Sequence, residues 1–390
     1  MEHDILVIGA GPAGLACAGC LAQRGMPARV VDAAADVGAS WRGHYDRLRL
    51  HTVKAWSAMP GMRFPRDTPR YPSRQQMVDY LEGYARHFGI RPDFGQQVLK
   101  VTSSDGGWAA ATASGRSYRA RHVVVATGAN RAPRMPAFEG QARFSGTVMH
   151  SRVYRNAAQF SGRRVLVVGL GNSGAEIALD LAQQGVDVTL SVRSPQNIVY
   201  RDVLGVPVHL TALLLSRLPP SWGDAVSAVL RDMTVGDLRR WGISTSSLAP
   251  MRQVRDTGRA PLIDTGTVAR IRRGDIGVRP AIRRFLPRGV VFADGGEAAF
   301  DAVILATGYQ PQLAQLFPDQ PLALDDDGLP RQEIGAGMHA GLYFAGFDTH
   351  SPEGMLRRIA LQAQHIAAVI HARTQGQGHG SAPAETGALR

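Results

Sequence analysis

Cysteine is scarce in this chain of 390 residues, which contains only Cys17 and Cys20. Two thiols cannot form a disulfide framework, so the fold must depend on a packed apolar core. The chain also lacks an apolar run of the roughly 18 to 20 residues that span a bilayer. It starts with Met1-Glu2-His3-Asp4 and shows no basic segment followed by a cleavable apolar one. We therefore expect a cytoplasmic protein without a membrane span.

Lysine is almost absent as well. Lys54 and Lys100 are the only lysines among 44 basic residues, which outnumber 32 acidic ones and give a net charge of +12. The arginines are scattered in pairs such as Arg239-Arg240 and Arg357-Arg358. A nucleic-acid-binding protein usually concentrates its charge in a stripe or a tail. We therefore expect no nucleic-acid partner. The excess of arginine over lysine reads as a compositional bias, to which the attraction of anionic cofactors can contribute.

Short apolar runs that end in glycine turns dominate what the chain does contain. Three of them, Ile5–Ile8, Val165–Val168 and Leu342–Phe344, read as buried parallel strands of an α/β protein. Two further runs, His122–Gly128 and Ala302–Gly308, both end in Ala-Thr-Gly and form a weak internal repeat. Polar, turn-rich segments that read as hairpins precede both repeats. The pattern predicts two Rossmann-like dinucleotide-binding domains, the second inserted into the first.

A further segment, residues 73–90, reads as an amphipathic helix. Ser73 and Gln76 have the spacing of a capping box. Met77, Leu81 and Tyr84 follow at helical spacing on one face, which we assign to core packing.

The first glycine loop is Gly9-Ala-Gly11-Pro-Ala-Gly14. Gly9 permits the tight turn, Gly11 lets the backbone approach a pyrophosphate, and Gly14 lets the helix pack closely on the strand. The free N–H groups at the start of that helix attract phosphate. The next strand ends at Asp32, whose carboxylate can accept hydrogen bonds from ribose and would repel a 2′-phosphate. The first site is therefore predicted to bind FAD.

The second glycine loop, Gly169-Leu-Gly171-Asn172-Ser173-Gly174, repeats this logic with a different strand after it. That strand ends at Arg193-Ser194 and carries no acidic residue at its tip. Arginine pairs bidentately with phosphate, so the second site is predicted to prefer NADPH over NADH. The alternative is that Arg193 is an ordinary surface residue.

One string between the two loops carries a family resemblance. Phe144-Ser-Gly146-Thr-Val-Met-His150-Ser-Arg-Val-Tyr154 resembles the FxGxxxHxxxY fingerprint of class B flavoprotein monooxygenases. That family places it between its FAD and NADPH domains. The related Baeyer–Villiger branch has tryptophan at the last position, so Tyr154 argues against that branch.

Other segments, spread over nearly the whole chain, resemble the YUCCA branch of plant flavin monooxygenases, which convert indole-3-pyruvate to indole-3-acetate. These segments are Tyr45–His51, Met62–Pro65, Tyr71–Tyr84, Gly171–Gly174, Thr257–Asp264 and Ala306–Tyr309. The resemblance implies an FAD- and NADPH-dependent enzyme that forms a flavin C4a-(hydro)peroxide. It would then transfer one oxygen atom of O2 to a small aromatic or indolic substrate.

Alternatives to this function stay open on the sequence. One is S- or N-oxygenation of another metabolite, and another is an FAD- and NADPH-binding redox sensor without turnover. The oligomeric state, monomer or homodimer, is also open. No histidine or cysteine spacing points to a metal site.

Several site assignments follow from the resemblance, each beside a plainer role. His51 is placed near the flavin, or in the core, and Lys54 is placed against a cofactor or substrate anion, or in solvent. Trp41 would pack beside FAD or serve the fold alone. His150 and Tyr154 would set the domain junction and the NADPH geometry. Cofactor contacts are also assigned to Gly308, Gly346 and Asp348. For Asp348 the alternative is a structural role, in which its side chain stabilises the turn of its own loop.

The predicted division of the chain follows from these motifs. Residues 1–157 and 296–372 form the FAD domain, and residues 158–295 form the NADPH domain. A helical insert at about 200–242 is expected near the substrate, and residues 373–390 are expected to be a disordered tail. Cys17 and Cys20 fall inside the first helix, where we expect buried and unreactive thiols.

Overall fold

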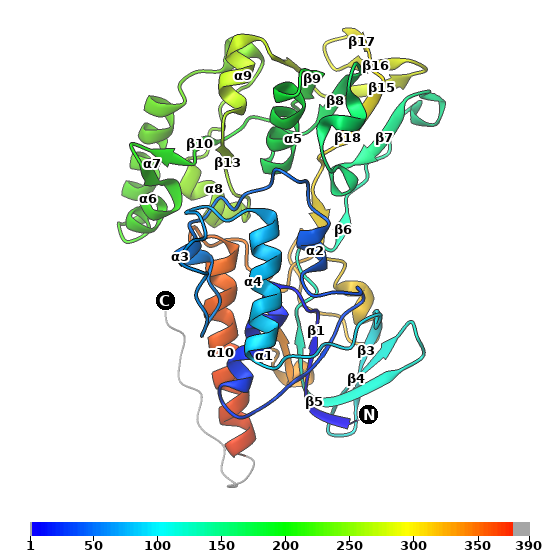
Figure 1. Ribbon diagram of the computed structural model, residues 1–390, viewed down its shortest axis with the longest axis vertical. Coiled ribbons are helices and arrows are strands. Elements are labelled where there is room, and N and C mark those ends of the chain that lie inside the picture. Colours follow the sequence, from blue (N-terminus) through cyan, green and yellow to red (C-terminus); the bar gives the residue numbers. More distant parts are fainter. Residues whose placement is uncertain (1, 377–390) are drawn as a thin grey trace.

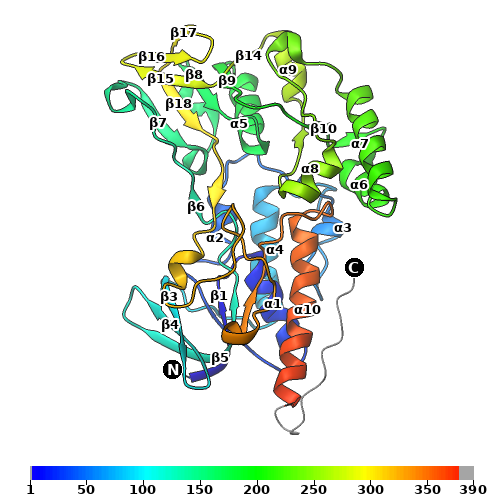
Figure 2. The ribbon, with the colours of Figure 1, turned by 180° about the vertical axis from the view of Figure 1, so that it is seen from behind.

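The computed structural model describes residues 2–376, which form two α/β units stacked along the long axis of the molecule (Figures 1 and 2). The first sheet has the order β2-β1-β5-β4-β3, and β20 lies beside the carboxyl half of β5. Its strands are β1 (Glu2–Ile8), β2 (Arg29–Val31), β3 (Val98–Ser104), β4 (Gly107–Thr112), β5 (Ser117–Val125) and β20 (Leu342–Phe344). The β3–β4–β5 meander is antiparallel and confirms the hairpin predicted before the first Ala-Thr-Gly.

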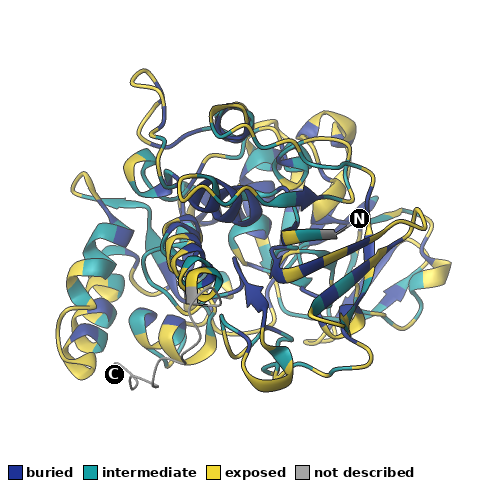
Figure 3. Cartoon of the chain, turned by 90° about the horizontal axis from the view of Figure 1, so that it is seen from below, coloured by how far each residue is buried: buried dark blue, intermediate teal, exposed yellow. Residues whose placement is uncertain are grey.

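Both faces of this sheet are buried, which explains the continuous apolar runs. In β1, Ile5 and Val7 face a core shared with the helices, whereas Leu6 and Ile8 face a second core beneath the meander. A strand covered on both sides has no polar face to alternate with its apolar one. Figure 3 shows the buried residues gathered in the strands and the inner helices, with the connecting loops exposed.

Three helices cover one face of the first sheet: α1 (Pro12–Ala22), α4 (Arg74–His87) and α10 (Met355–Gly376). In α1 every residue from Ala13 to Leu21 is buried, since α10 and α4 pack on its outer side. The predicted capping box of α4 is confirmed, because Ser73 Oγ accepts from Gln76 N–H and the Gln76 side chain accepts from Ser73 N–H.

The second sheet is entirely parallel, with the order β14-β9-β8-β18-β7. Its strands are β7 (Thr147–His150), β8 (Arg164–Val168), β9 (Asp187–Ser191), β14 (Ile276–Arg279) and β18 (Ala302–Leu305). Helices α5 (Asn172–Gln183) and α9 (Thr267–Arg273) cover one face. A three-stranded antiparallel sheet covers the other with β15 (Ile282–Leu286), β16 (Gly289–Phe292) and β17 (Glu297–Ala299).

The helical insert, predicted at about 200–242, extends over residues 198–264 in the structure. It leaves the second unit after β9 and reaches toward the first unit (Figure 1). It contains α6 (Val208–Leu215), α7 (Pro220–Thr234) and α8 (Pro250–Thr257), together with the short strands β10 (Ile198–Tyr200), β11 (Asp202–Val203), β12 (Val206–Pro207) and β13 (Leu262–Asp264). Its outer face is unusually apolar: Leu204 is 99% exposed, Met233 79% and Trp222 68%.

Short elements complete the described chain. They are α2 (Ala39–Arg42), α3 (Lys54–Ser57), β6 (Ala132–Pro133), β19 (Tyr309–Gln310) and the 3-10 turns η1 (Gln141–Arg143), η2 (Ser151–Val153), η3 (Ala157–Phe160), η4 (Arg239–Trp241), η5 (Ala314–Leu316) and η6 (Gly337–His339). Of these, β6 and β19 are the two connections between the units, and they pair antiparallel with each other.

Two predicted boundaries differ from the structure. Strands β7 and β18 were assigned to the FAD domain, but both hydrogen-bond within the second sheet, where β18 lies between β7 and β8. The predicted tail starts too early, because α10 continues to Gly376 and Arg373 donates to the hydroxyl of Tyr343. The rest of that tail, residues 377–390, lies outside the described residues. Among residues 2–376, no helix has both the length and the apolar character needed to cross a membrane.

Candidate active site between two nucleotide-binding loops

The carboxyl ends of the two sheets face each other across the paired connections. β5 ends at Val125 and leads to β6, and β18 ends at Leu305 and leads to β19. Because β6 pairs with β19, these two strand ends are brought to one place. Ligands of open α/β sheets bind outside the carboxyl ends of the strands. The arrangement therefore brings two nucleotide sites together at the junction.

The first glycine loop has the geometry that its sequence predicts. Gly9 has a φ of +117°, and a Cβ there would lie 2.4 Å from the carbonyl oxygen of Ala126. A Cβ on Gly14 would lie 1.8 Å from the oxygen of Gly9, so the helix packs directly on the turn. At Gly11, by contrast, a Cβ would meet nothing within 4 Å. The loop thus opens at the position where a phosphate would approach the start of α1.

Asp32 ties the end of β2 to this loop. One carboxylate oxygen accepts from Ala10 N–H at 2.5 Å and the other from Ala34 N–H at 2.7 Å. Trp41 lies on α2, partly buried against the core of the first unit. Both residues therefore border the first nucleotide site, and their contacts with the ribose or the flavin remain predictions.

The second loop repeats the first. Gly169 has a φ of +104°, a Cβ on Gly174 would lie 2.0 Å from the oxygen of Gly169, and a Cβ on Gly171 would meet nothing within 4 Å. Asn172 accepts from Ile263 N–H at 2.9 Å, which anchors the start of α5 to β13. Ser173 follows within the first turn of α5 and is partly exposed.

Arg193 and Ser194 lie just beyond the end of β9, and both are exposed. Among residues 2–376 no carboxylate pairs with Arg193, so its guanidinium is available to a ligand. Ser194 accepts from the side chain of Gln196 through its carbonyl oxygen at 2.8 Å. This position at the tip of the second strand is where a 2′-phosphate is expected.

Buried polar atoms without partners show that the junction fits a nucleotide pair. Thr127, beside Gly9, and Arg131, in the connection from β5 to β6, both have a buried side-chain nitrogen or oxygen that no described group satisfies. Burial also lowers the pKa of Arg131. Buried polar groups normally have hydrogen-bond partners, so these atoms together with the two open glycines suit dinucleotides. FAD fits the first loop and NADPH the second.

The fingerprint residues lie where the two units meet. His150 ends β7, and its Nδ1 accepts from Arg152 N–H at 3.0 Å. With Nδ1 acting as acceptor, the neutral ring carries its proton on Nε2, which donates to the carbonyl oxygen of Gly308 at 3.1 Å. Gly308 has a φ of +85°, as Gly128 has +86° at the end of the first Ala-Thr-Gly. His150 therefore holds the second Ala-Thr-Gly turn against β7.

Tyr154 is fully buried in the second core rather than exposed at the junction. Its hydroxyl donates to Asp180 on α5 at 2.6 Å, and its ring stacks on Phe160 at 5.8 Å. Burial and this bond raise the pKa of the Tyr154 hydroxyl. It can influence NADPH only through the position of α5.

Replacing Tyr154 with Phe is expected to destabilise the protein without changing cofactor binding. The variant loses one buried hydrogen bond to a carboxylate, which is worth about 1.5–3 kcal/mol. Urea unfolding should show that loss, while the Michaelis constant for NADPH stays at the wild-type value. A large rise in that constant at unchanged stability would instead place Tyr154 against the cofactor.

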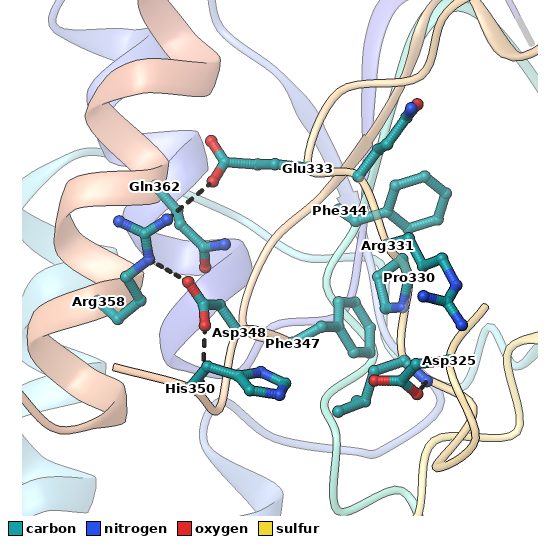
Figure 4. Close-up of a pocket in the computed structure, with 12 residues that line it drawn as sticks. Asp325, Pro330, Arg331, Glu333, Phe344, Phe347, Asp348, His350, Arg358 and Gln362 are labelled. Atoms are coloured by element: carbon teal, nitrogen blue, oxygen red, sulfur yellow. Dashed lines mark hydrogen bonds and ion pairs between the residues drawn. The ribbon is translucent and has the colours of Figure 1, made fainter. Parts of the chain in front are cut away.

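The third predicted strand, β20, leads into a loop that passes the start of α1. A Cβ on Gly346 would lie 2.9 Å from Ala13, and Gly346 N–H donates to Gln362 on α10 at 3.1 Å. Asp348 accepts from His350 N–H at 3.0 Å and forms an ion pair with Arg358 (Figure 4). Asp348 thus turns its loop and borders a cavity of about 440 Å³ beside α10.

His51 is largely buried, and its Nδ1 has no partner among the described residues. Burial, reinforced by the positive charge of Arg201, lowers the pKa of His51 to about 4, so the ring is neutral near pH 7. The ammonium group of Lys54 is bound within the protein, because its Nζ donates to the carbonyl oxygens of Arg66 and Thr68 at 2.8 and 2.5 Å. These bonds anchor the loop before Arg70.

Lowering the pH from 7 to 5 is expected to destabilise the protein partly through His51. The folded-state pKa of about 4 lies below the value of 6.5 for an exposed histidine, so the unfolded chain binds more protons between pH 6.5 and 4. Stability contributed by the neutral ring is therefore lost as the pH falls through that window, by about 1–2 kcal/mol at pH 5. Urea unfolding should show a smaller pH effect in His51→Gln than in the wild type, and equal pH effects would contradict this assignment.

Comparison with known proteins agrees with this geometry. The family described as pyridine nucleotide-disulphide oxidoreductase matches residues 6–206. Indole-3-pyruvate monooxygenase YUCCA4 of Oryza sativa is 36% identical over 96% of this chain and 88% of its own length. YUCCA6 of Arabidopsis thaliana is 37% identical over 94% and 89%, respectively. The chain belongs to the YUCCA family of flavin monooxygenases.

Solved structures show the same architecture. A double mutant of a flavin monooxygenase from Stenotrophomonas maltophilia superimposes with a TM-score of 0.74 at 25% identity, covering 96% of this chain and 99% of that one. A cyclohexanone monooxygenase from Rhodococcus shares the fold, with a TM-score of 0.73 at 19% identity over 96% and 85%. This chain is therefore an FAD- and NADPH-dependent monooxygenase with two Rossmann-like domains.

Disulfide chemistry, which appears in the description of the matched family, has no support in this flavin monooxygenase. Cys17 and Cys20 are free and fully buried inside α1, as the sequence predicts. Burial raises the pKa of both thiols, that of Cys20 to about 11. Thiolates, not thiols, react with disulfides, so both residues are unreactive packing residues. Within residues 2–376, no group of three or more potential ligands could hold a metal ion.

Sequence reasoning missed a group of residues where the insert meets the first unit of this flavin monooxygenase. Tyr71 donates to Asp202 at 2.5 Å, and the guanidinium of Arg201 lies 4.1 Å from the Tyr71 ring centre. His209 on α6 accepts from Val53 N–H at 3.4 Å. No motif marks these residues, since they meet only through long-range packing. The resemblance located the segment around Tyr71 but not its partners.

Proposed function

We propose that this enzyme oxidatively decarboxylates an aromatic 2-oxo acid, with indole-3-pyruvate as the substrate and indole-3-acetate as the product. The observation that carries the proposal is similarity at 34–37% identity, over most of the chain, to proteins named indole-3-pyruvate monooxygenases. The overall reaction consumes the 2-oxo acid, O2, NADPH and a proton. It releases the shortened acid, CO2, water and NADP⁺, so that atoms and electrons balance.

In this proposal the two glycine loops hold the cofactors in contact at the junction. When bound, FAD supplies the oxygen-activating chemistry and NADPH supplies the hydride. Gly11 and the start of α1 bind the FAD pyrophosphate, while Asp32 faces its ribose. Gly171 and the start of α5 bind the NADPH pyrophosphate, and Arg193 pairs with its 2′-phosphate.

Near the reacting atoms the chain would contribute the neutral side chain of His51 and a close contact between the insert and the first unit. His51 is neutral because of its burial, so it neither adds a charge nor supplies a strong acid there. The insert closes over the 51–57 loop through Tyr71–Asp202 and His209–Val53. Exclusion of water protects reactive oxygen species from unproductive decay. The hydrogen bond from His150 to Gly308 fixes the turn that follows the second Ala-Thr-Gly strand beside these residues.

The proposal is tested by incubating the purified holoenzyme with NADPH, indole-3-pyruvate and ¹⁸O2. Mass spectrometry should find indole-3-acetate carrying one heavy oxygen atom, formed in step with NADPH consumption. A reaction without enzyme corrects for spontaneous oxidation of the 2-oxo acid. NADPH consumption without labelled product contradicts the proposal, and S- or N-oxide formation from another substrate would identify the alternative oxygenase.

A further inference from the structure

Arg201 occupies a fixed position where the insert contacts the first unit. It follows β10, its N–H donates to Asp264 at 3.2 Å, and its carbonyl oxygen accepts from Val208 at 2.9 Å. The backbone is thus held within the insert, by β13 on one side and by the start of α6 on the other. Its side chain crosses to the first unit and lies on the ring of Tyr71.

The orientation of the Arg201 guanidinium is set by two contacts that leave its terminal amino groups unused. Its carbon lies 4.1 Å above the centre of the Tyr71 ring, and Nε lies 3.3 Å from a carboxylate oxygen of Asp202. Among the described residues, no acceptor pairs with the terminal nitrogens. The side chain is 27% exposed, so it is not closed off from solvent. A planar guanidinium fixed in this way presents two parallel donors to a carboxylate.

The charges around Arg201 do not cancel. Arg70 and Arg201 share the single carboxylate of Asp202, at 3.6 and 3.3 Å, so this cluster retains one positive charge. Glu176, the next carboxylate to feel the charge of Arg201, is paired with Arg47 at 3.6 Å. One more anion would therefore balance the charges of Arg70, Arg201 and Asp202.

Two neutral imidazoles lie on the elements that meet here, His209 on α6 and His51 just before α3. His209 is 5% exposed, its Nε2 accepts from Val53 N–H at 3.4 Å, and its ring lies 5.5 Å from that of Trp56. Because Nε2 accepts, the proton of the neutral ring is on Nδ1, which has no partner among the described residues. His51, whose Nδ1 is also unpaired, lies close enough to Arg201 to feel its charge. A fixed cation and an unpaired donor suit an aromatic carboxylate.

We propose that Arg201 binds the carboxylate of the 2-oxo acid, with the Nδ1–H of His209 as a second donor from the insert. The inference rests on the proposed function and adds the residue that selects an anionic substrate. Arg201 is thus a specificity residue for charged substrates.

The test compares two ligands that differ in charge and hardly in shape: indole-3-acetate and its neutral amide, indole-3-acetamide. Their dissociation constants for the oxidised holoenzyme with NADP⁺ are measured by calorimetry, beside the Michaelis constant for indole-3-pyruvate. In Arg201→Gln, binding of the acetate should weaken by about 10- to 100-fold, the size of a charge-assisted hydrogen-bond pair. Binding of the amide and the Michaelis constant for NADPH should stay unchanged.

Two further variants separate recognition from folding. Arg70→Gln removes the other positive charge of the same cluster, at a side chain that is 51% exposed, and it should weaken acetate binding less than Arg201→Gln does. Arg201→Lys keeps the charge without the paired donors and should fall between the wild type and Arg201→Gln. If Arg201→Gln does not fold, Arg201→Lys and the acetate-to-amide ratio still decide the question.

Two results overturn the inference in distinguishable ways. In the first, Arg201→Gln weakens binding of the acetate and of the amide equally and still converts indole-3-pyruvate. Arg201 would then only support the local fold. The second result is a wild-type enzyme that does not convert indole-3-pyruvate and does not bind the acetate more tightly than the amide. This result contradicts both the proposed function and the inference that rests on it.

Discussion

The Gly11→Val variant is expected to purify as a folded but colourless protein. A Cβ at this position meets nothing within 4 Å, so the protein itself can accommodate the added atoms. They would instead occupy the space through which the FAD pyrophosphate approaches the start of α1. Losing even two charge-assisted hydrogen bonds, each about 1.5–3 kcal/mol, weakens FAD binding by at least about 100-fold. The flavin content is measured from absorbance at the visible flavin band, and folding from circular dichroism.

The second loop offers a matched control, because Gly171 has the same open environment. Gly171→Val should remain yellow while its flavin is no longer reduced rapidly by NADPH under anaerobic conditions. The two variants thus separate the sites although the substitution is the same. Full flavin content in Gly11→Val, or colourless Gly171→Val, would contradict the assignment of the two loops.

Replacing Arg193 with Ala is expected to raise the Michaelis constant for NADPH by about 10- to 100-fold, as expected for a lost charge-assisted hydrogen bond to phosphate. The constant for NADH, which lacks the 2′-phosphate, should hardly change. Arg193 is exposed just past the end of β9, so the substitution leaves the core intact. Steady-state NAD(P)H oxidation with each cofactor measures both constants.

Arg163→Ala is the control for a general loss of positive charge. Arg163 is also exposed, but it precedes β8 and therefore lies at the opposite, amino end of the sheet. Its replacement should leave both constants unchanged. If Arg193→Ala affects NADPH and NADH equally, Arg193 is an ordinary surface residue and the preference for NADPH originates elsewhere.

Local patterns account for the elements that were predicted well. The capping box at Ser73 and Gln76 depends on residues three positions apart, and the glycine loops depend on a turn of six residues. Their geometry follows from backbone sterics and from hydrogen bonds within one turn, which a sequence displays directly. The two-sided burial of Ile5–Ile8 in β1 is equally local, since a run of four apolar residues in a strand must be covered on both faces.

The predictions that failed concern elements whose place depends on distant partners. β7 and β18 are apolar strands that fit either sheet by composition, and only their pairing with β8 assigns them to the second. The predicted tail began at 373, within a helix that is extended by packing against β20. The roles predicted for Lys54 and Tyr154 toward substrate and cofactor stay predictions. Their partners within the protein, the loop carbonyls and Asp180, are ones that no spacing rule indicates.

The amino-acid sequence alone determined that this protein has two nucleotide-binding loops on parallel strands and belongs among flavin monooxygenases. It could do so because turns, helix caps and buried strands depend on residues that are neighbours in the sequence. Only the tertiary structure decided that the carboxyl ends of both sheets meet at β6 and β19, and that Arg201 crosses from the insert to Tyr71. Those contacts join residues about 130 to 180 positions apart, and their free energy comes from packing and charge burial that form only when the whole chain is folded.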